Sequence, residues 1–295
     1  MSSEMDPSEV TALQALLKKG YDELRRGNIA AAAQCCQQAL QAKPDLVPGH
    51  FLVGLVALEG KDRKTAFSAF QSVVKLDPNH GAAWAHLAKL YMSDGQVNLA
   101  DAALRETLRL QPDVPVVLDM IGTTLSLMGE YDAARAFYTQ ANEKKPDYPP
   151  FLQNLANNLV YHGETDDAEA VFRHIIELQP DSPQSHWGLS SSSKAKDTRH
   201  IKQMRTLQAQ HQNDPRSQAF YLYAIGKEHE DLQQWDEAFA AFSAGAAARR
   251  ATVEYDEAAE VAMFKYLEQQ YSAAWMESRP TGNPDASPIF VLGQP

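Results

Sequence analysis

Five prolines recur through the first part of the 295-residue chain at a constant interval of 34 residues. They are Pro44, Pro78, Pro112, Pro146 and Pro180. Proline lacks a backbone N–H and disfavours the α conformation in the residue before it, so each one ends a helix. The Asp or Asn that follows each proline can accept hydrogen bonds from the free N–H groups of the next helix. The pattern therefore predicts helical units of constant length.

Small residues occupy the same places in every unit when the units start at Leu13, Val47, Gly81, Pro115 and Pro149. A small side chain lets two helices approach closely, so these places predict the contact between the helices of a pair. The eighth places are Gly20, Gly54, Ala88, Gly122 and Ala156, and the twentieth places are Ala32, Ala66, Ala100, Ala134 and Ala168. Glycine adopts positive φ without a Cβ penalty, which predicts the turn between the helices. The turn glycines are Gly27, Gly95, Gly129 and Gly163, and one place earlier in the second unit Gly60.

These residues resemble the tetratricopeptide repeat, and the third unit, GAAWAHLAKLYMSDGQVNLADAALRETLRLQP, is similar to the family pattern. The resemblance covers five units over residues 13–180. It implies an all-α fold, a right-handed superhelical solenoid of helix-turn-helix pairs. The departures are Lys19 and Glu23 at apolar places of the first unit and His50 at an aromatic place of the second. We expect the first unit to pack loosely or to act as a polar cap.

The chain beyond Pro180 keeps the register less strictly. Residues 183–215 have the length of a sixth unit, but the run SSSSKAKDTRH has no turn glycine, so we expect two helices joined by a longer polar connection. Residues 219–250 regain the register as a further unit whose second helix runs on to Arg250. Residues 251–278 predict a helix that caps the last unit, because solenoid ends must be covered. Residues 1–12 form an N-terminal extension.

Residues 279–295 change in composition. RPTGNPDASP predicts a turn-rich linker, and PIFVLGQP predicts the first residues of a buried strand. This ending, with residues 239–260, is similar to bacterial proteins in which a sulfotransferase domain follows a tetratricopeptide array. The resemblance implies that Pro295 opens the loop that holds 3′-phosphoadenosine-5′-phosphosulfate. The basic, Ser, Gly and Thr residues of that loop are not among these 295, so we predict no cofactor for them.

Composition excludes several other classes of protein. The net charge of −11 disfavours sequence-independent binding to nucleic acid. No apolar run reaches the roughly twenty residues that span a bilayer, so no membrane partner is expected. The adjacent Cys35 and Cys36 cannot cross-link distant segments, and we expect them to be small buried residues. These features predict a cytoplasmic protein.

No catalytic or metal-binding constellation stands out. The nine histidines, such as His86 and His162, lack the paired spacing and acidic partner of a zinc-binding helix. The acidic pairs Asp166–Asp167 and Asp236–Glu237 fall in the first turns of predicted helices, where they offset the helix dipole. We therefore predict no catalytic, cofactor or metal residue.

One face of the first helices predicts a concave peptide groove, because places two, five, nine and twelve lie on the same side of a helix. The groove residues are Tyr21, Phe51, Leu55, His86, Lys89, Asp119, Thr123, Gln153, Asn154, Asn157, Tyr223 and Lys227. The groove runs from apolar at its N-terminal end to amide-rich in the middle, and amides can pair with both C=O and N–H of an extended peptide. Only Lys18 and Lys89 match places that carry a carboxylate clamp in some family members, so no clamp is expected.

Three functions follow as hypotheses. The leading one is a non-catalytic scaffold that binds a protein or peptide segment in this groove. The second is the substrate-recruiting N-terminal part of a sulfotransferase. The third is self-assembly through the repeats. The identity of the partner and the oligomeric state stay open.

Overall fold

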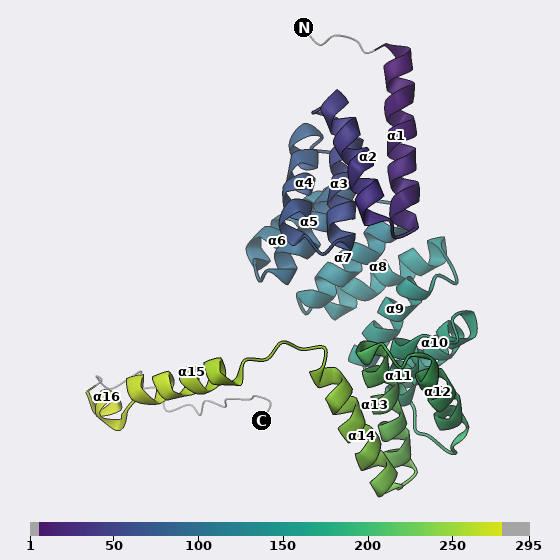
Figure 1. The fold of residues 1–295 in the computed structure, drawn as a ribbon, viewed down its shortest axis with the longest axis vertical. Helices are drawn as coiled ribbons and strands as arrows, with labels where there is room; N and C mark the ends of the chain where they lie inside the picture. The colour runs from purple at the N-terminus through teal and green to yellow at the C-terminus, as the bar shows by residue number, and fades with distance from the viewer. Residues whose placement is uncertain (1–5, 279–295) are drawn as a thin grey trace.

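The computed structural model describes residues 6–278, which form sixteen helices and no strand (Figure 1). The prediction of an all-α helical solenoid is confirmed. The first helices of the five units are α1 (Pro7–Arg25), α3 (Val47–Glu59), α5 (Gly81–Ser93), α7 (Pro115–Leu127) and α9 (Pro149–Tyr161). The second helices are α2 (Ile29–Ala42), α4 (Arg63–Leu76), α6 (Val97–Arg109), α8 (Tyr131–Lys144) and α10 (Thr165–Leu178). Four of the five first helices begin at the predicted unit start, whereas α1 begins earlier, at Pro7, within the predicted extension.

The remaining helices complete the described chain. They are α11 (Pro183–Ser192), α12 (Arg199–Gln210), α13 (Pro215–Asp231), α14 (Trp235–Arg250), α15 (Glu257–Gln270) and α16 (Ala273–Glu277). The expected longer connection between the helices of the sixth pair is confirmed as residues 193–198, and α14 does run on to Arg250. The predicted linker and strand over 279–295 lie outside the described residues.

The small residues at the eighth and twentieth places do bring the paired helices together. All five twentieth-place alanines are 0% exposed. At the eighth place, a Cβ added to Gly54 would lie 2.5 Å from a ring carbon of Phe70, and one added to Gly122 would lie 2.7 Å from Tyr138. An aromatic ring from the second helix thus covers the glycine of the first, and nothing larger than hydrogen fits between them.

The turn between paired helices places its left-handed residue at the fifteenth place of the unit. This residue is glycine in four units, with φ between 71° and 85°. In the second unit α3 does end at the predicted Gly60, but Gly60 has φ −75° and the positive value, 60°, lies on Lys61. In the last unit Gln233 has the positive value, 59°. The register of the repeat therefore decides which residue is left-handed, even where that residue is not glycine.

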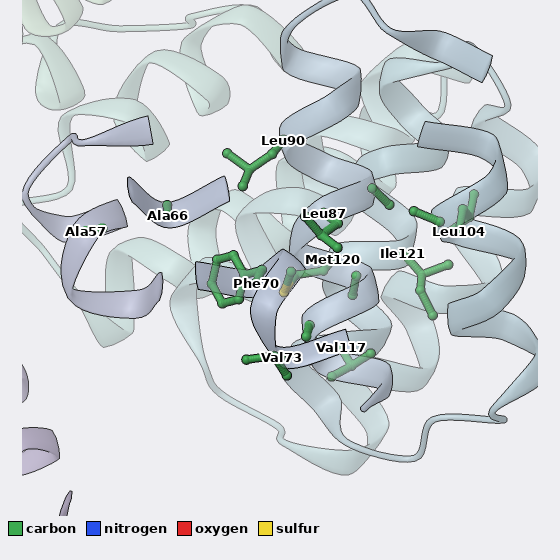
Figure 2. Packing of buried hydrophobic residues seen from close by; sticks show 14 residues of the cluster. Ala57, Ala66, Phe70, Val73, Leu87, Leu90, Leu104, Val117, Met120 and Ile121 are labelled. Carbon is green, nitrogen blue, oxygen red and sulfur yellow. The ribbon is translucent and has the colours of Figure 1, made fainter. Parts of the chain in front are cut away.

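The core is a series of apolar clusters along the array. The largest joins α3 to α7, and Figure 2 shows Phe70, Leu87 and Ile121 among its side chains. Smaller clusters continue it toward α1 and toward α14. Cys35 and Cys36 are buried free thiols, as expected, and burial raises the pKa of Cys36 to about 11.

The sixth pair departs from the hairpin arrangement. α11 packs between α10 and α13, whereas α12 packs on α13 and does not fold back along α11. The connection 193–198 is held to α13 by the backbone N–H of Ala195, which donates to Asp231 at 2.9 Å. This opening of the pair positions the second site described below.

The predicted cap over the last unit is wrong. α15 has no buried residue, and Figure 1 shows it extending away from α14. Successive residues of a helix are rotated by about 100°, so Val261 and Met263 point in different directions around α15. Ala259, Met263, Tyr266 and Leu267 share one side of α15, but all four are exposed, so no described element covers that side.

Candidate functional site

The twelve predicted groove residues all lie on first helices of the array, and we call the surface that they define the first-helix face. They are distributed over α1 (Tyr21), α3 (Phe51, Leu55), α5 (His86, Lys89), α7 (Asp119, Thr123), α9 (Gln153, Asn154, Asn157) and α13 (Tyr223, Lys227). Neighbouring helices contact each other through several of these side chains.

Aromatic rings join α3 to α5. The ring of His86 stacks on Phe70 with a centroid distance of 4.4 Å and meets Phe51 edge-on at 5.8 Å. Burial lowers the pKa of His86 to about 4, so the imidazole is neutral at pH 7. His86 therefore acts as a packing residue of this face and does not offer it a charge.

A carboxylate–amide pair joins α7 to α9. Asn154 Nδ2 donates to both carboxylate oxygens of Asp119, at 2.8 and 3.1 Å. Burial raises the pKa of Asp119 above its usual value. The hydrogen bond from Asn154 and the positive charge of Lys89 offset only part of this rise. Thr123 is turned inward, donating from Oγ1 to the backbone carbonyl of Asp119 at 2.9 Å. The middle of the face thus combines one exposed cation with a half-buried acid.

The remaining amides are partly used within the fold. Gln153 donates from Nε2 to Asn157 at 3.1 Å and accepts from Ser185 of α11 at 2.9 Å. Within residues 6–278, Asn157 Nδ2 and Asn154 Oδ1 carry no hydrogen bond. The other amide groups of Gln153, Asn154 and Asn157 are used within the fold.

The two α13 residues face the connection 193–198 and the last hairpin. Lys227 donates to Asp231 at 2.7 Å and also to the carbonyl oxygen of Ser193. The ring of Tyr223 lies 6.2 Å from Trp187 and 6.4 Å from Phe242. Lys227 therefore holds the connection in place.

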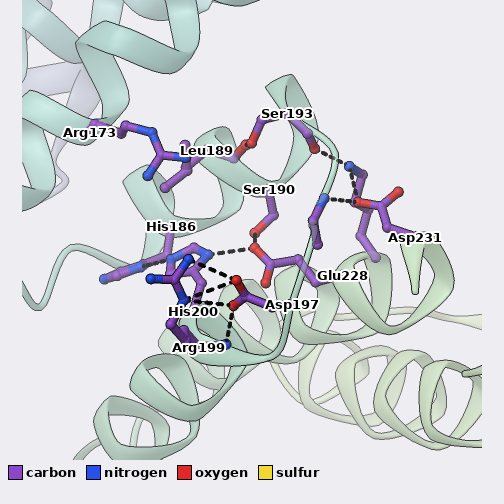
Figure 3. Close-up of polar contacts among 12 residues, drawn as sticks. Arg173, His186, Leu189, Ser190, Ser193, Asp197, Arg199, His200, Glu228 and Asp231 are labelled. Carbon is purple, nitrogen blue, oxygen red and sulfur yellow. Dashed lines mark hydrogen bonds and ion pairs between the residues drawn. The ribbon is translucent and has the colours of Figure 1, made fainter.

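A second site lies where α11, α12 and α13 meet, and its residues were not predicted (Figure 3). His186, which is 0% exposed, hydrogen-bonds through Nε2 to the carbonyl oxygen of Pro180 at 2.8 Å. A carbonyl only accepts, so Nε2 carries the proton, and burial lowers the pKa of this imidazole to about 4. Nδ1 is then the acceptor for His200 Nε2, which lies 2.7 Å away.

The chain of hydrogen bonds ends at a buried carboxylate. His200 Nδ1 lies 2.5 Å from Glu228 Oε1, and Ser190 Oγ donates to the same oxygen at 2.7 Å. Glu228 is 4% exposed, and its Oε2 has no partner among the residues described. Ser190 donates to a carboxylate and not to an imidazole, so it lacks the base that activates a serine nucleophile.

This network borders a hollow of about 650 Å³ between α10, α12 and the connection 193–198. Glu228 and His200 line it, and ion pairs stand on its walls. Arg173 pairs with Glu169 at 2.7 Å, and Arg199 pairs with Asp197 at 2.8 Å.

One sequence signal could have revealed this site. Glu228 occupies the tenth place of its unit, where the second and third units carry the buried apolar residues Val56 and Leu90. A charged residue at a core place requires a polar partner. Nothing in the repeat pattern indicated that the partners would be Ser190 and His200.

Within residues 6–278 no three His, Cys, Asp or Glu side chains cluster as a metal site would require. None of the helices there combines the length and the apolar character that crossing a membrane demands.

Comparison with known families agrees with the geometry. Residues 57–121 and 125–190 match one family model described as tetratricopeptide repeat, and residues 17–81 match a second with the same description. Superkiller protein 3 of Schizosaccharomyces pombe is 29% identical over 135 residues, which are 44% of this chain. The matched stretch spans 10% of that protein's length.

Solved structures show the same fold. A thermophilic tetratricopeptide protein of Thermus thermophilus aligns with a TM-score of 0.53 at 21% identity, over 61% of this chain and 98% of its own. The Cut9–Hcn1 hetero-tetramer of the APC/C contains a chain that aligns with a TM-score of 0.63 at 16% identity, over 72% of this chain and 43% of that one.

Proposed function

Because the chain belongs to the tetratricopeptide repeat family, we propose that it is a protein-interaction scaffold whose first-helix face binds a polypeptide segment. The observation that carries the proposal is the continuity of that face. Phe51 contacts His86 between α3 and α5, Asp119 contacts Asn154 between α7 and α9, and Gln153 contacts Ser185 between α9 and α11. Successive first helices thus form one surface long enough for an extended segment.

The chemistry of the face suggests what the segment contains. Tyr21, Phe51 and Leu55 are half-buried and offer apolar contact near the N-terminal end. Lys89, the Asp119 carboxylate and Asn157 offer one cation, one acid and one free amide donor in the middle. A segment with apolar residues at one end and mixed polar residues at its centre complements this order. Cut9 crystallised in an assembly with Hcn1, which is in line with an interaction role for the shared fold.

Selection from a random peptide library on the full chain tests the proposal. Peptides that are enriched are then measured by fluorescence anisotropy against a variant carrying Lys89→Ala and Asn157→Ala, two exposed positions of the face. We expect the Kd to rise about tenfold or more, which corresponds to roughly 1.4 kcal/mol. The matched control carries Lys75→Ala and Gln140→Ala, exposed positions on the second helices α4 and α8. Equal weakening in both variants, or no enriched peptide, would reject the first-helix face as the binding surface.

The adjacent free thiols Cys35 and Cys36 and the acidic composition support a cytoplasmic location for this scaffold. Fractionation of cells that express the full chain would test this part of the proposal.

The alternative is that these repeats recruit substrate for a sulfotransferase. It rests on the resemblance of PIFVLGQP to the opening of that domain. Sequencing the gene past the codon for Pro295 tests it. A continuation with a basic residue followed by Ser, Gly and Thr supports the alternative, and an unrelated continuation removes it.

A further inference from the structure

The last two long helices of the described chain each present an apolar surface that no described element covers. On α14, Trp235 is 61% exposed, and Phe239, one turn further along the same side, is 75% exposed. On α15, the exposed side includes Met263 and Tyr266. Contiguous exposed apolar surface usually marks an interaction site, so both helices indicate a partner.

The regular units show what α14 lacks. Its two exposed rings hold the seventeenth and twenty-first places of their unit. In the second unit the residue at the twenty-first place, Phe67, meets Tyr91 of the following first helix at a centroid distance of 4.8 Å. In the fourth unit the residue at the seventeenth place, Tyr131, stacks on Tyr161 of the following first helix at 4.9 Å. Both places thus face the first helix of the next unit, and the uncovered side of α14 is a surface for one more helix.

The ending of α14 explains why α15 does not take that position in its own chain. The regular second helices end at the twenty-ninth or thirtieth place, before the recurring proline at the thirty-second. In the last unit the thirty-second place is Arg250, and α14 continues through it. Two residues beyond the thirtieth place rotate the exit of the chain by about 200°. The connection 251–256 therefore leaves α14 on a different side, and α15 extends away (Figure 1).

Contacts within the connection keep α15 on this course. Arg250 donates to the carbonyl oxygen of Val253 at 3.0 Å, and its guanidinium lies 5.3 Å from the centre of the Tyr255 ring. Tyr255 in turn donates to Glu260 in the first turn of α15 at 2.7 Å. The start of α15 is thus joined to the connection and not to the outer side of α14.

Charge indicates which helix fits on α14. Its last turn carries Arg249 and Arg250, whereas the first turn of α15 carries Glu257 and Glu260. Helices joined by short loops pack antiparallel, so an added helix starts beside the end of α14. In that direction the acidic start of α15 meets the basic end of α14, and the two helix dipoles favour the same arrangement. The apolar side of α15 then runs along the aromatic side of α14.

We propose that α15 of one copy of this chain covers the aromatic side of α14 in a second copy, and that the exchange is reciprocal. A two-fold dimer of this kind covers the apolar surfaces of both helices in both copies. The inference goes beyond the proposed function and does not rest on it, because α14 and α15 carry none of the twelve residues of the first-helix face.

Sedimentation equilibrium of the full chain between about 1 μM and about 1 mM tests the proposal. We expect the mass to rise with concentration from 32.7 kDa toward twice that value. A chain that stays at 32.7 kDa up to about 1 mM would overturn the proposal, whether α15 then closes on its own α14 or binds a different protein.

Two charged variants locate the interface. Phe239→Glu on α14 and Met263→Glu on α15 replace exposed side chains, so each should fold, which circular dichroism checks, and each should raise the dimer Kd about tenfold or more. Val261→Glu is the matched control, because Val261 is also exposed but points about 200° away from Met263 around α15. It should dimerise like the unmodified chain. An unchanged Kd in Phe239→Glu, or equal values in Met263→Glu and Val261→Glu, would refute the proposal.

A mixture of the two variants distinguishes exchange from pairing of like surfaces. A mixed dimer of Phe239→Glu with Met263→Glu retains one unmodified α15 on one unmodified α14, so the mixture should dimerise more tightly than either variant alone. Pairing of α15 with α15 would leave Phe239→Glu as tight as the unmodified chain, and pairing of α14 with α14 would do the same for Met263→Glu. Either result, or a mixture no tighter than its components, would overturn the proposal.

Discussion

Trp84 donates a hydrogen bond from Nε1 to the carbonyl oxygen of Pro78 at 2.9 Å. His50 makes the equivalent bond to Pro44 at 2.8 Å, and His186 makes it to Pro180 at 2.8 Å. All three rings occupy the fourth place of a unit and bond to the proline that precedes the unit. His50, a departure from the repeat pattern by residue type, therefore keeps the function of the aromatic residue that it replaces.

This hydrogen bond predicts that the stability of the fold depends on the ring N–H of His50. His50→Phe keeps an aromatic ring but removes the donor, and should lower the free energy of unfolding by about 1 kcal/mol. His50→Trp restores a ring N–H and should lower it by less. Urea unfolding followed by circular dichroism compares the two variants. Equal stability of the two would show that the ring, and not the hydrogen bond, matters there.

The eighth-place glycines predict a steric effect. Gly122→Ala places a Cβ 2.7 Å from Tyr138 and should destabilise the fold by about 1–3 kcal/mol. Gly81→Ala has no contact under 3.6 Å at the start of α5 and should be neutral or stabilising. In a Tyr138→Leu background the cost of Gly122→Ala should fall, because the ring is the obstacle. An unchanged cost in that background would contradict the steric explanation.

At the fifteenth place of each unit, where φ is positive, we expect some substitutions to raise the stability of the fold and others to lower it. Lys61→Gly and Gln233→Gly should each stabilise the fold by up to about 1 kcal/mol, since a side chain disfavours positive φ. Gly129→Ala, where nothing lies within 4 Å of the added Cβ, should cost about 1 kcal/mol through conformation alone. Thermal unfolding of the three single variants measures both signs. A loss on Lys61→Gly would mean that the lysine side chain itself contributes to stability.

The neutral imidazole of His86 predicts how stability depends on pH. Its pKa in the fold is about 4, below the usual 6.5. Above pH 6.5 neither the folded nor the unfolded state binds the proton, so His86 has no effect on stability. Between pH 6.5 and 4 only the unfolded state binds it, so the free energy of unfolding decreases as the pH is lowered. From pH 7 to 4.5 the loss should be about 2 kcal/mol, and His86→Phe should remove it. An NMR titration of the ring gives the pKa directly, and a value near 6.5 would refute this explanation.

The local effects of proline and glycine on helix ends explain how much of the fold could be predicted from the sequence. Pro112 or Gly129 acts on the residues next to it, and these effects repeat in every unit, so the boundaries of α3, α5, α7 and α9 follow from short-range rules. The small alanines such as Ala66 also predict pair contacts, because their partners lie at a constant distance in the chain.

Contacts between different units escaped such rules. Asp119 and Asn154 are 35 residues apart, and their bond depends on how α9 is placed against α7. The network of His186, His200 and Glu228 draws on three helices, one of which leaves the repeat pattern. The helical spacing of Ala259, Met263, Tyr266 and Leu267 predicted that α15 would cap the last unit, but an apolar stripe does not say which element it packs against, and α15 has no buried residue.

The opening of the sixth pair has a mechanical consequence for the whole molecule. The five regular units meet the last hairpin mainly through α11, a helix of ten residues, because α12 packs chiefly on α13 and contacts α11 through the His186–His200 pair. In a solenoid, stability passes only between neighbours. Energetic coupling between the N-terminal and C-terminal blocks therefore depends mainly on this short helix, and we expect the array to unfold as two cooperative blocks joined at α11.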